Sequence, residues 1–184
     1  MNKKILLILM SVSFLNAEPL KFQKRNDLNK EYYDLASKNL ENLKEKMNYI
    51  LNKTPENEQM ELCLGTQEDI QKDFNKNLKE KNFVKRVGLN AVNDNNKVNK
   101  IDKKIIKGFE DFKQKKVLFL GNWNKYILYT PIRLKNDCLR CHGEDINKKD
   151  ESLMKSIYKK GEFKQNYKEG DLIGVWKSEV SKGY

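Results

Sequence analysis

Apolar residues recur at helical spacing through the first third of the chain. Leu28, Tyr32 and Leu35 are four and three residues apart. The same spacing continues, with polar residues in between, through Ala36, Leu40, Leu43, Met47 and Ile50. This period predicts one long amphipathic helix from Glu18 to about Asn52. Its apolar stripe suits packing on its own domain better than a coiled coil between two chains, because the heptads are few.

A second helix is predicted from Pro55 to about Lys79. Thr54 is a candidate N-cap, and Pro55 suits the first helical position because it lacks an N–H group. The apolar face of this helix carries Met60, Cys63, Ile70 and Phe74. Cys63 and Met60 are three positions apart, so both are expected to face inward.

The rest of the chain has the pattern of short strands, with one further helix. Strands are predicted at Phe83–Val87, Val117–Leu120, Tyr126–Ile132 and Asp171–Val180, and Ile101, Ile105, Phe109 and Phe112 predict a short helix. The turn at Gly121-Asn122 predicts that its two flanking strands pair antiparallel. Together these elements predict an α+β fold, with long N-terminal helices packed on an antiparallel sheet. We expect one domain over 18–184, helical over 18–82 and sheet-forming over 83–184.

The N-terminus has the pattern of an export signal. Lys3 and Lys4 precede the apolar run Ile5–Leu15, and a small-residue stop ends at Ala17. We therefore expect a signal peptide at 1–17, cleavage after Ala17 and a periplasmic protein. An uncleaved anchor is the alternative, although the apolar run is shorter than the roughly 20 residues of a spanning helix. After cleavage no transmembrane span is expected.

The chemistry of the chain is concentrated in Cys138-Leu139-Arg140-Cys141-His142. Cys-x-x-Cys-His is the attachment motif of haem c, in which two thiols form thioethers with the porphyrin and the histidine binds the iron. Haem c is attached after export, which agrees with the expected signal peptide. His142 is also the only histidine among the 184 residues. The motif therefore predicts one covalent haem held by Cys138 and Cys141, with His142 as axial ligand.

Two other interpretations of the cysteines were weighed. A thioredoxin-like dithiol requires a parallel βαβ unit, and the strand pattern predicts none. A zinc site from Cys63, Cys138, Cys141 and His142 has the right number of ligands. Adjacent Cys141 and His142 would then have to bind one ion, which is sterically awkward.

The sixth position of the iron stays open on the residues alone. No second imidazole exists, so Cys63, a methionine (Met47, Met60 or Met154), a lysine, water or no ligand is left. Periodicity does not choose between Cys63 and Met60. Chemistry favours Cys63, because iron ligation protects a lone thiol from oxidation outside the cytoplasm. Thiolate ligation lowers the reduction potential, whereas methionine raises it.

These residues resemble a family of single-haem, c-type domains of uncharacterised function. The resemblance is densest at Tyr129-Thr130-Pro131-Ile132, at 138–143, at Gly170-Asp171 and at Gly174, and it includes Glu61-Leu62-Cys63 and 86–90. It implies a PAS-like fold and a helical cysteine as second axial ligand, which is Cys63 in this chain. Family members occur as free exported proteins and as sensory modules. Gly88 stands where the family usually has serine.

Two classes of function follow. A redox- or gas-responsive haem sensor would lose or exchange its distal ligand, whereas an electron-transfer cytochrome c would keep both ligands. Peroxidase-like catalysis is a weak third possibility, because no second histidine supplies acid–base chemistry, so we expect no enzyme. The expected partners are the cytochrome c maturation machinery and either a redox partner protein or a small gas.

The net charge of the chain is strongly positive, with 37 Lys and Arg against 26 Asp and Glu. The lysines are spread out and have no aromatic stacking platform, so nucleic-acid binding is not expected. Lys148-Lys149 and Lys159-Lys160 are interpreted as a solvated face, suited to acidic redox partners or anionic lipid headgroups.

Overall fold

The computed structural model describes residues 19–55, 58–62, 66–79, 81–91, 93–111, 117–157 and 166–182. Within these residues, five strands form one antiparallel sheet in the order β1-β3-β4-β5-β2. The strands are β1 (Lys21–Phe22), β2 (Phe83–Val87), β3 (Leu118–Gly121), β4 (Lys125–Arg133) and β5 (Leu172–Ser181). The predicted α+β class and the predicted β3–β4 hairpin are confirmed. The two short apolar runs meet at a tight turn and are buried on both faces of the sheet.

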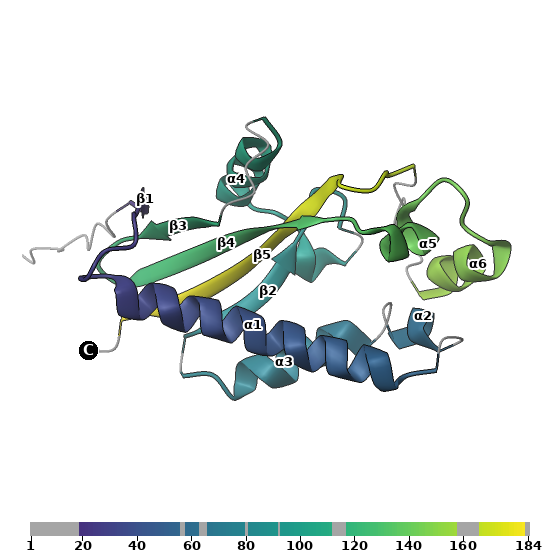
Figure 1. Ribbon diagram of the computed structural model, residues 1–184, viewed down its shortest axis with the longest axis horizontal. Helices are drawn as coiled ribbons and strands as arrows, with labels where there is room; N and C mark the ends of the chain where they lie inside the picture. Colours follow the sequence, from purple (N-terminus) through teal and green to yellow (C-terminus); the bar gives the residue numbers. More distant parts are fainter. Residues whose placement is uncertain are drawn as a thin grey trace, which may run out of the picture.

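Helices cover both faces of this sheet (Figure 1). The longer helices are α1 (Lys30–Lys53), α3 (Gln67–Lys76), α4 (Lys100–Asp111) and α6 (Lys148–Ile157), and the short ones are α2 (Gln59–Glu61) and α5 (Leu139–His142). α1 and α3 pack on one face and α4 on the other. α5 and α6 lie beyond one end of the β4–β5 pair (Figure 1).

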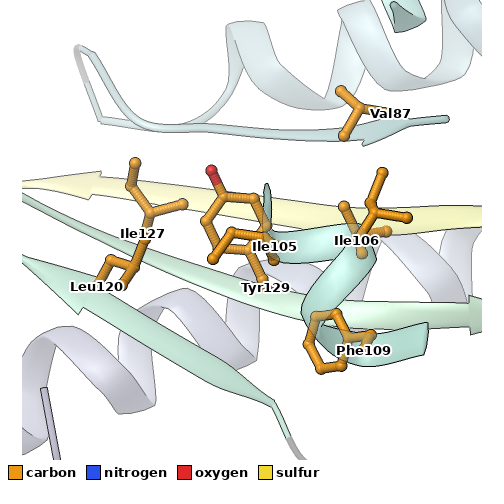
Figure 2. Packing of buried hydrophobic residues seen from close by; sticks show 8 residues of the cluster. Val87, Ile105, Ile106, Phe109, Leu120, Ile127 and Tyr129 are labelled. Carbon is orange, nitrogen blue, oxygen red and sulfur yellow. The ribbon is translucent and has the colours of Figure 1, made fainter. Parts of the chain in front are cut away.

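The α4 side holds the largest apolar cluster, shown in Figure 2. Ile105, Ile106 and Phe109 of α4 pack on sheet residues Val87, Leu120, Ile127, Tyr129 and Val175. The predicted apolar face is confirmed at Ile105 and Phe109, whereas Ile101 is 45% exposed and Ile106 takes its place in the cluster.

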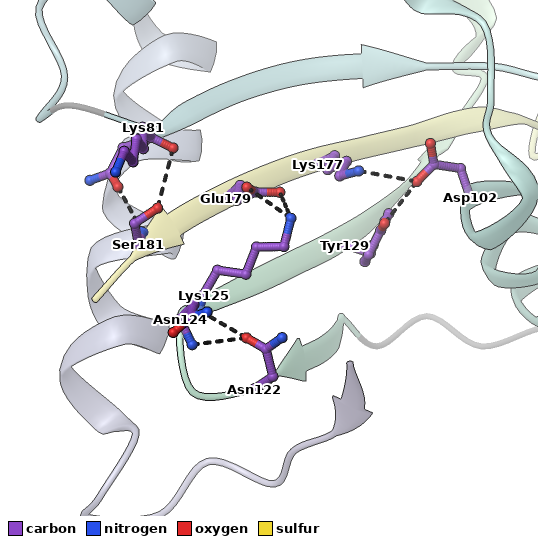
Figure 3. A network of polar contacts seen from close by, with 10 residues as sticks. Lys81, Asp102, Asn122, Asn124, Lys125, Tyr129, Lys177, Glu179 and Ser181 are labelled. Carbon is purple, nitrogen blue, oxygen red and sulfur yellow. Dashed lines mark hydrogen bonds and ion pairs between the residues drawn. The ribbon is translucent and has the colours of Figure 1, made fainter. Parts of the chain in front are cut away.

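A buried polar network fixes the start of α4 on the sheet (Figure 3). The Tyr129 hydroxyl donates to Asp102 Oδ1 at 2.7 Å, and Lys177 Nζ lies 3.4 Å from the same oxygen. The other oxygen of Asp102 accepts from the Asn99 N–H, and Asn99 Oδ1 accepts from the Asp102 N–H, which is a reciprocal cap. Burial, together with Asp102, raises the pKa of Tyr129 well above its ordinary range.

The α1 side of the sheet has two smaller apolar clusters. Ala36 packs with the first, on Phe119, Tyr126, Leu128 and Val180, and Leu40 and Leu43 pack with the second, on Ile70 and Val84. Side chains alternate along a strand, so Ser178 and Thr130 face this side while Lys177 and Tyr129 face α4. Ser178 Oγ, Thr130 Oγ1 and Asn39 Nδ2 are buried and have no hydrogen-bond partner among the described residues.

The first predicted helix is corrected at its start. α1 begins at Lys30 rather than Glu18, because Lys21 and Phe22 pair with the edge of β3 instead. Asn26 and Asn29 then close a turn in which each side chain accepts from the backbone N–H of the other. Asparagine competes in this way with helical backbone bonding.

The second predicted helix is also corrected. Helical structure is described from Gln59, in α2, rather than from Pro55, and α3 ends at Lys76 rather than at about Lys79. Thr54 closes α1 instead of capping the next helix, since its hydroxyl donates to the Ile50 carbonyl at 2.8 Å and its backbone is extended. Pro55 precedes α2 without being part of it.

Several predictions lie outside the described residues: the signal peptide at 1–17, Cys63, Phe112 and Lys159-Lys160. In the described part of the chain, no helix is both long enough and apolar enough to cross a membrane.

Candidate functional site

The Cys-x-x-Cys-His motif lies in the connection between the two longest strands. A 3-10 turn (Asn136–Cys138) leads directly into α5, which ends at His142. Backbone bonds join both ends of this connection: the Leu134 N–H donates to the Asp171 carbonyl, and the Gly170 N–H donates to the Leu134 carbonyl. The motif is therefore anchored at the end of the β4–β5 pair.

Gly143 allows the helical turn of the motif to close. Its N–H donates to the Leu139 carbonyl at 2.8 Å. A Cβ atom at position 143 would lie 2.6 Å from that carbonyl oxygen, so any other residue would force the turn apart. Glycine at this position keeps Cys138, Cys141 and His142 on one turn of chain.

Arg140 joins α5 to α6. Its Nε atom donates to Asp150 Oδ2 at 3.0 Å, and Asn147 Nδ2 donates to the same oxygen. The hydrogen bond from Arg140 and that from Asn147 lower the pKa of Asp150, although its burial opposes them. Asp150 is therefore ionised at neutral pH and holds the outer side of the motif.

Both thiols are half-buried, and neither belongs to a disulfide. The Cys141 Sγ atom lies 3.5 Å from Met60 Sδ. Met60 is buried, so α2 packs directly against the motif although the two are 81 positions apart. The structure thus brings Met60 to the motif, whereas Cys63 lies outside the described residues.

His142 is exposed as a residue, yet the surrounding protein lowers its pKa. Burial of the imidazole is the larger cause and the positive charge of Arg86 on β2 the smaller one. The neutral imidazole, which is the form that binds metals, is therefore favoured at neutral pH. The Arg86 guanidinium lies 5.6 Å from the centre of the Trp176 ring.

Tyr167 holds the other side of His142. Its N–H donates to the His142 carbonyl at 3.0 Å, and the two rings meet edge to face with centres 6.2 Å apart. The Tyr167 hydroxyl accepts from Asn90 Nδ2 at 2.9 Å, which connects the motif to the loop after β2. Sequence reasoning expected Tyr167 to pack on the sheet or the porphyrin, but it did not find Asn90, because a polar residue in an asparagine-rich loop carries no pattern.

The absence of serine at position 88 has a structural explanation. A Cβ atom on Gly88 would lie 2.9 Å from the Ile173 carbonyl oxygen, and one on Gly174 would lie 2.3 Å from the Val87 carbonyl oxygen. The backbones of β2 and β5 approach too closely here for a side chain.

The residues of the motif fit a covalent haem. Two thiols three positions apart and an imidazole whose pKa is lowered lie on one turn, with the apolar Met60 side chain beside them. The alternative interpretations fare differently. The strand pairs of the described sheet are all antiparallel, so the parallel context of a thioredoxin-like dithiol is not met there. The zinc interpretation needs Cys63 and is not tested.

The fold and the site together define an α+β domain with a Cys-x-x-Cys-His turn at the end of an antiparallel sheet. The family model for Tll0287-like proteins matches residues 24–181, and the chain therefore belongs to the Tll0287-like family. A crystal structure of the cyanobacterial heme-protein Tll0287 has the same fold, with a TM-score of 0.62. That match has 15% sequence identity and covers 86% of this chain and 98% of the other. A comparison with curated proteins found no match.

Proposed function

We propose that this protein is an exported, periplasmic c-type haem protein that acts as a redox- or gas-responsive module. The observation that carries the proposal is the anchored turn on which Cys138, Cys141 and His142 lie together. Membership of the Tll0287-like family supports it, since the structurally similar Tll0287 is a heme-protein. Cys138 and Cys141 would form the two thioethers, and His142 would bind the iron.

When bound, the haem would supply an iron that changes oxidation state and accepts small ligands. The chain's own residues prepare its place. Arg140 and Asp150 hold the outer side of α5, Tyr167 holds the His142 backbone and ring, and the lowered pKa of His142 keeps its nitrogen lone pair available. The imidazole therefore does not have to lose a proton before it binds the iron.

We propose Cys63 as the second axial ligand, on the resemblance to the family, with Met60 as the alternative. The Met60 sulfur lies against Cys141, so the segment that precedes Cys63 is adjacent to the motif. Gln59 Nε2 in α2 also donates to the Thr54 carbonyl at 3.2 Å, which connects α2 to the end of α1. A change at the sixth position would therefore reach α1 through α2, as a sensor requires.

The alternative function is electron transfer by a single-haem periplasmic cytochrome. The exposure of His142 and the partial exposure of both cysteines favour it, because a redox partner could approach this end of the molecule. We propose no enzymatic activity, with peroxidase-like chemistry as a weak alternative. Partners would be the maturation machinery and a redox protein or small gas, with no nucleic acid.

The first experiment tests covalent attachment. The chain is expressed with the cytochrome c maturation machinery, and the intact mass of the denatured periplasmic protein is measured by mass spectrometry. We expect the mass of the chain from Glu18 plus that of one haem. The double variant with Cys138→Ser and Cys141→Ser should lack the added mass of the haem. The unmodified mass in the parent protein would refute the proposal.

The second experiment separates the two functions. Amide hydrogen exchange of residues 59–62 is compared between the ferric and ferrous proteins, along with their paramagnetic resonance and optical spectra. A sensor predicts faster exchange in one redox state, with a spectrum that changes in Cys63→Ser. A carrier predicts equal exchange, and a spectrum that changes in Met60→Ala alone would identify a His/Met cytochrome.

A further inference from the structure

Three large apolar side chains project into solvent near the start of the described chain. Leu28 is 90% exposed, Phe22 69% and Trp123 67%, the three highest values among the large hydrophobic residues described. Scattered exposed apolar residues are ordinary on a protein surface. These three differ because they share one end of the molecule.

The sheet register and one ring stack bring them together. Phe22 in β1 pairs with Leu120 in β3, three residues before Trp123. On the other side, Leu28 lies in the turn before α1, four positions before Tyr32. The Tyr32 ring stacks on Tyr126 with centres 4.7 Å apart. Figure 1 shows β1, the start of α1 and the β3–β4 turn at one end, with α5 and α6 at the opposite end.

Tight turns hold two of the three side chains outward. The Leu28 N–H donates to Asn26 Oδ1, in the turn that buried Asn29 closes by donating to the Lys24 carbonyl. Trp123 lies in a turn where Asn122 Oδ1 accepts from the N–H groups of Asn124 and Lys125, as Figure 3 shows. These bonds fix the backbone of both turns, from which Leu28 and Trp123 project.

Basic side chains surround the three projections. In the segments 21–34, 122–126 and 179–182, six residues are basic and four are acidic. The basic ones are Lys21, Lys24, Arg25, Lys30, Lys125 and Lys182, and the acidic ones are Asp27, Glu31, Asp34 and Glu179. Two of the acids are paired, Asp34 with Arg25 and Glu179 with Lys125. The end therefore has a net positive charge around its apolar side chains.

We propose that this end binds the surface of a membrane that contains anionic phospholipids, with Trp123, Leu28 and Phe22 entering the headgroup region. Tryptophan side chains favour this region, and lysine side chains are attracted to an anionic membrane surface. Three separate projections suit a fluid headgroup layer, which adapts to each of them.

The proposal goes beyond the haem function and does not depend on it. Binding by this end would point α5, with Cys138, Cys141 and His142, away from the membrane and toward the aqueous compartment. A protein partner is the competing occupant of the same end.

The test is co-sedimentation of the chain from Glu18, which retains every described residue but lacks Ile5–Leu15. The vesicles are phosphatidylcholine alone or phosphatidylcholine with phosphatidylglycerol, at low and high salt. The double variant W123Q/L28S is compared with L89S/I157S, which removes two exposed apolar side chains elsewhere. Thermal unfolding confirms that both variants are folded.

We expect the parent to sediment with the anionic vesicles, less at high salt, and W123Q/L28S to bind about tenfold more weakly, as the loss of two inserted side chains implies. The control should match the parent. Three outcomes would overturn the proposal: no sedimentation of the parent, equal binding to both vesicles at every salt concentration, or equal losses in both double variants.

Discussion

The two faces of the sheet bury polar groups in opposite ways. On the α4 face, Asp102 is 1% exposed, and its carboxylate accepts a hydrogen bond from Tyr129 and forms an ion pair with Lys177. On the α1 face, three buried polar atoms of Asn39, Thr130 and Ser178 have no partner among the described residues. Helix α4 is thus fixed to the middle strands by directional bonds. On the other face, α1 packs through apolar contacts, and α3 bonds to the edge strand β2 through Asn75 and Gln71.

The difference bears on the proposed function. Directional bonds oppose sliding because every displacement breaks them, whereas apolar contact tolerates small shifts. α1 belongs to the tolerant face and is connected through Gln59 of α2 to Met60, next to Cys141. If ligand changes at the motif move an element, α1 is better placed to follow than α4.

Removing the carboxylate of the fixed face should have the largest effect. Asp102→Ala leaves Lys177 buried without its ion-pair partner and Tyr129 without its acceptor, which is expected to cost about 3–5 kcal/mol in the free energy of unfolding. Urea denaturation measures it. Asp111→Ala is the control on the same helix, because its pair with Lys107 is exposed and contributes about 1 kcal/mol or less. Similar losses in the two variants would show that the network is not a special anchor.

Tyr129→Phe should have an intermediate effect and a distinctive pH dependence. The pKa of Tyr129 is raised in the folded chain, whereas an unfolded tyrosine ionises near pH 10. The folded state therefore holds this proton longer, and the stability it contributes is complete below about pH 10 and falls above it, by up to about 1.4 kcal/mol per pH unit. Tyr129→Phe should lose about 1–2 kcal/mol at neutral pH.

The variant should also lose stability less steeply than the parent above pH 10, because it cannot ionise. Urea midpoints over a pH series compare the two slopes. Parallel slopes would contradict the burial of an un-ionised Tyr129.

The sequence predicted most of the sheet but not the ends of the helices. Strands such as Tyr126–Ile132 are short apolar runs bounded by turn residues, so they could be located. The start of α1 could not, because Leu28 continues the helical spacing while projecting into solvent. That residue belongs to a turn set by Asn26 and Asn29, whose side-chain bonds have no periodicity.

The candidate site was predictable only where a spacing rule applies. Cys138, Cys141 and His142 follow from one motif within five positions. Tyr167 contacts His142 from 25 positions away along the sequence, and Asn90, 52 positions from His142, bonds to Tyr167. No spacing rule predicts either contact. The packing of Met60 on Cys141 likewise depends on tertiary structure, although its inward orientation was expected.

The smallest effect is expected on the tolerant face, and its sign distinguishes the two faces. Ser178→Ala removes a buried hydroxyl that bonds to no described group, so the folded state no longer bears the desolvation of that group. The free energy of unfolding should stay equal or rise by up to about 1 kcal/mol, measured by urea denaturation beside Asp102→Ala. A loss above about 1 kcal/mol would mean that the hydroxyl has a bonded partner after all. The α1 face would then be as fixed as the α4 face, and the contrast between them would fail.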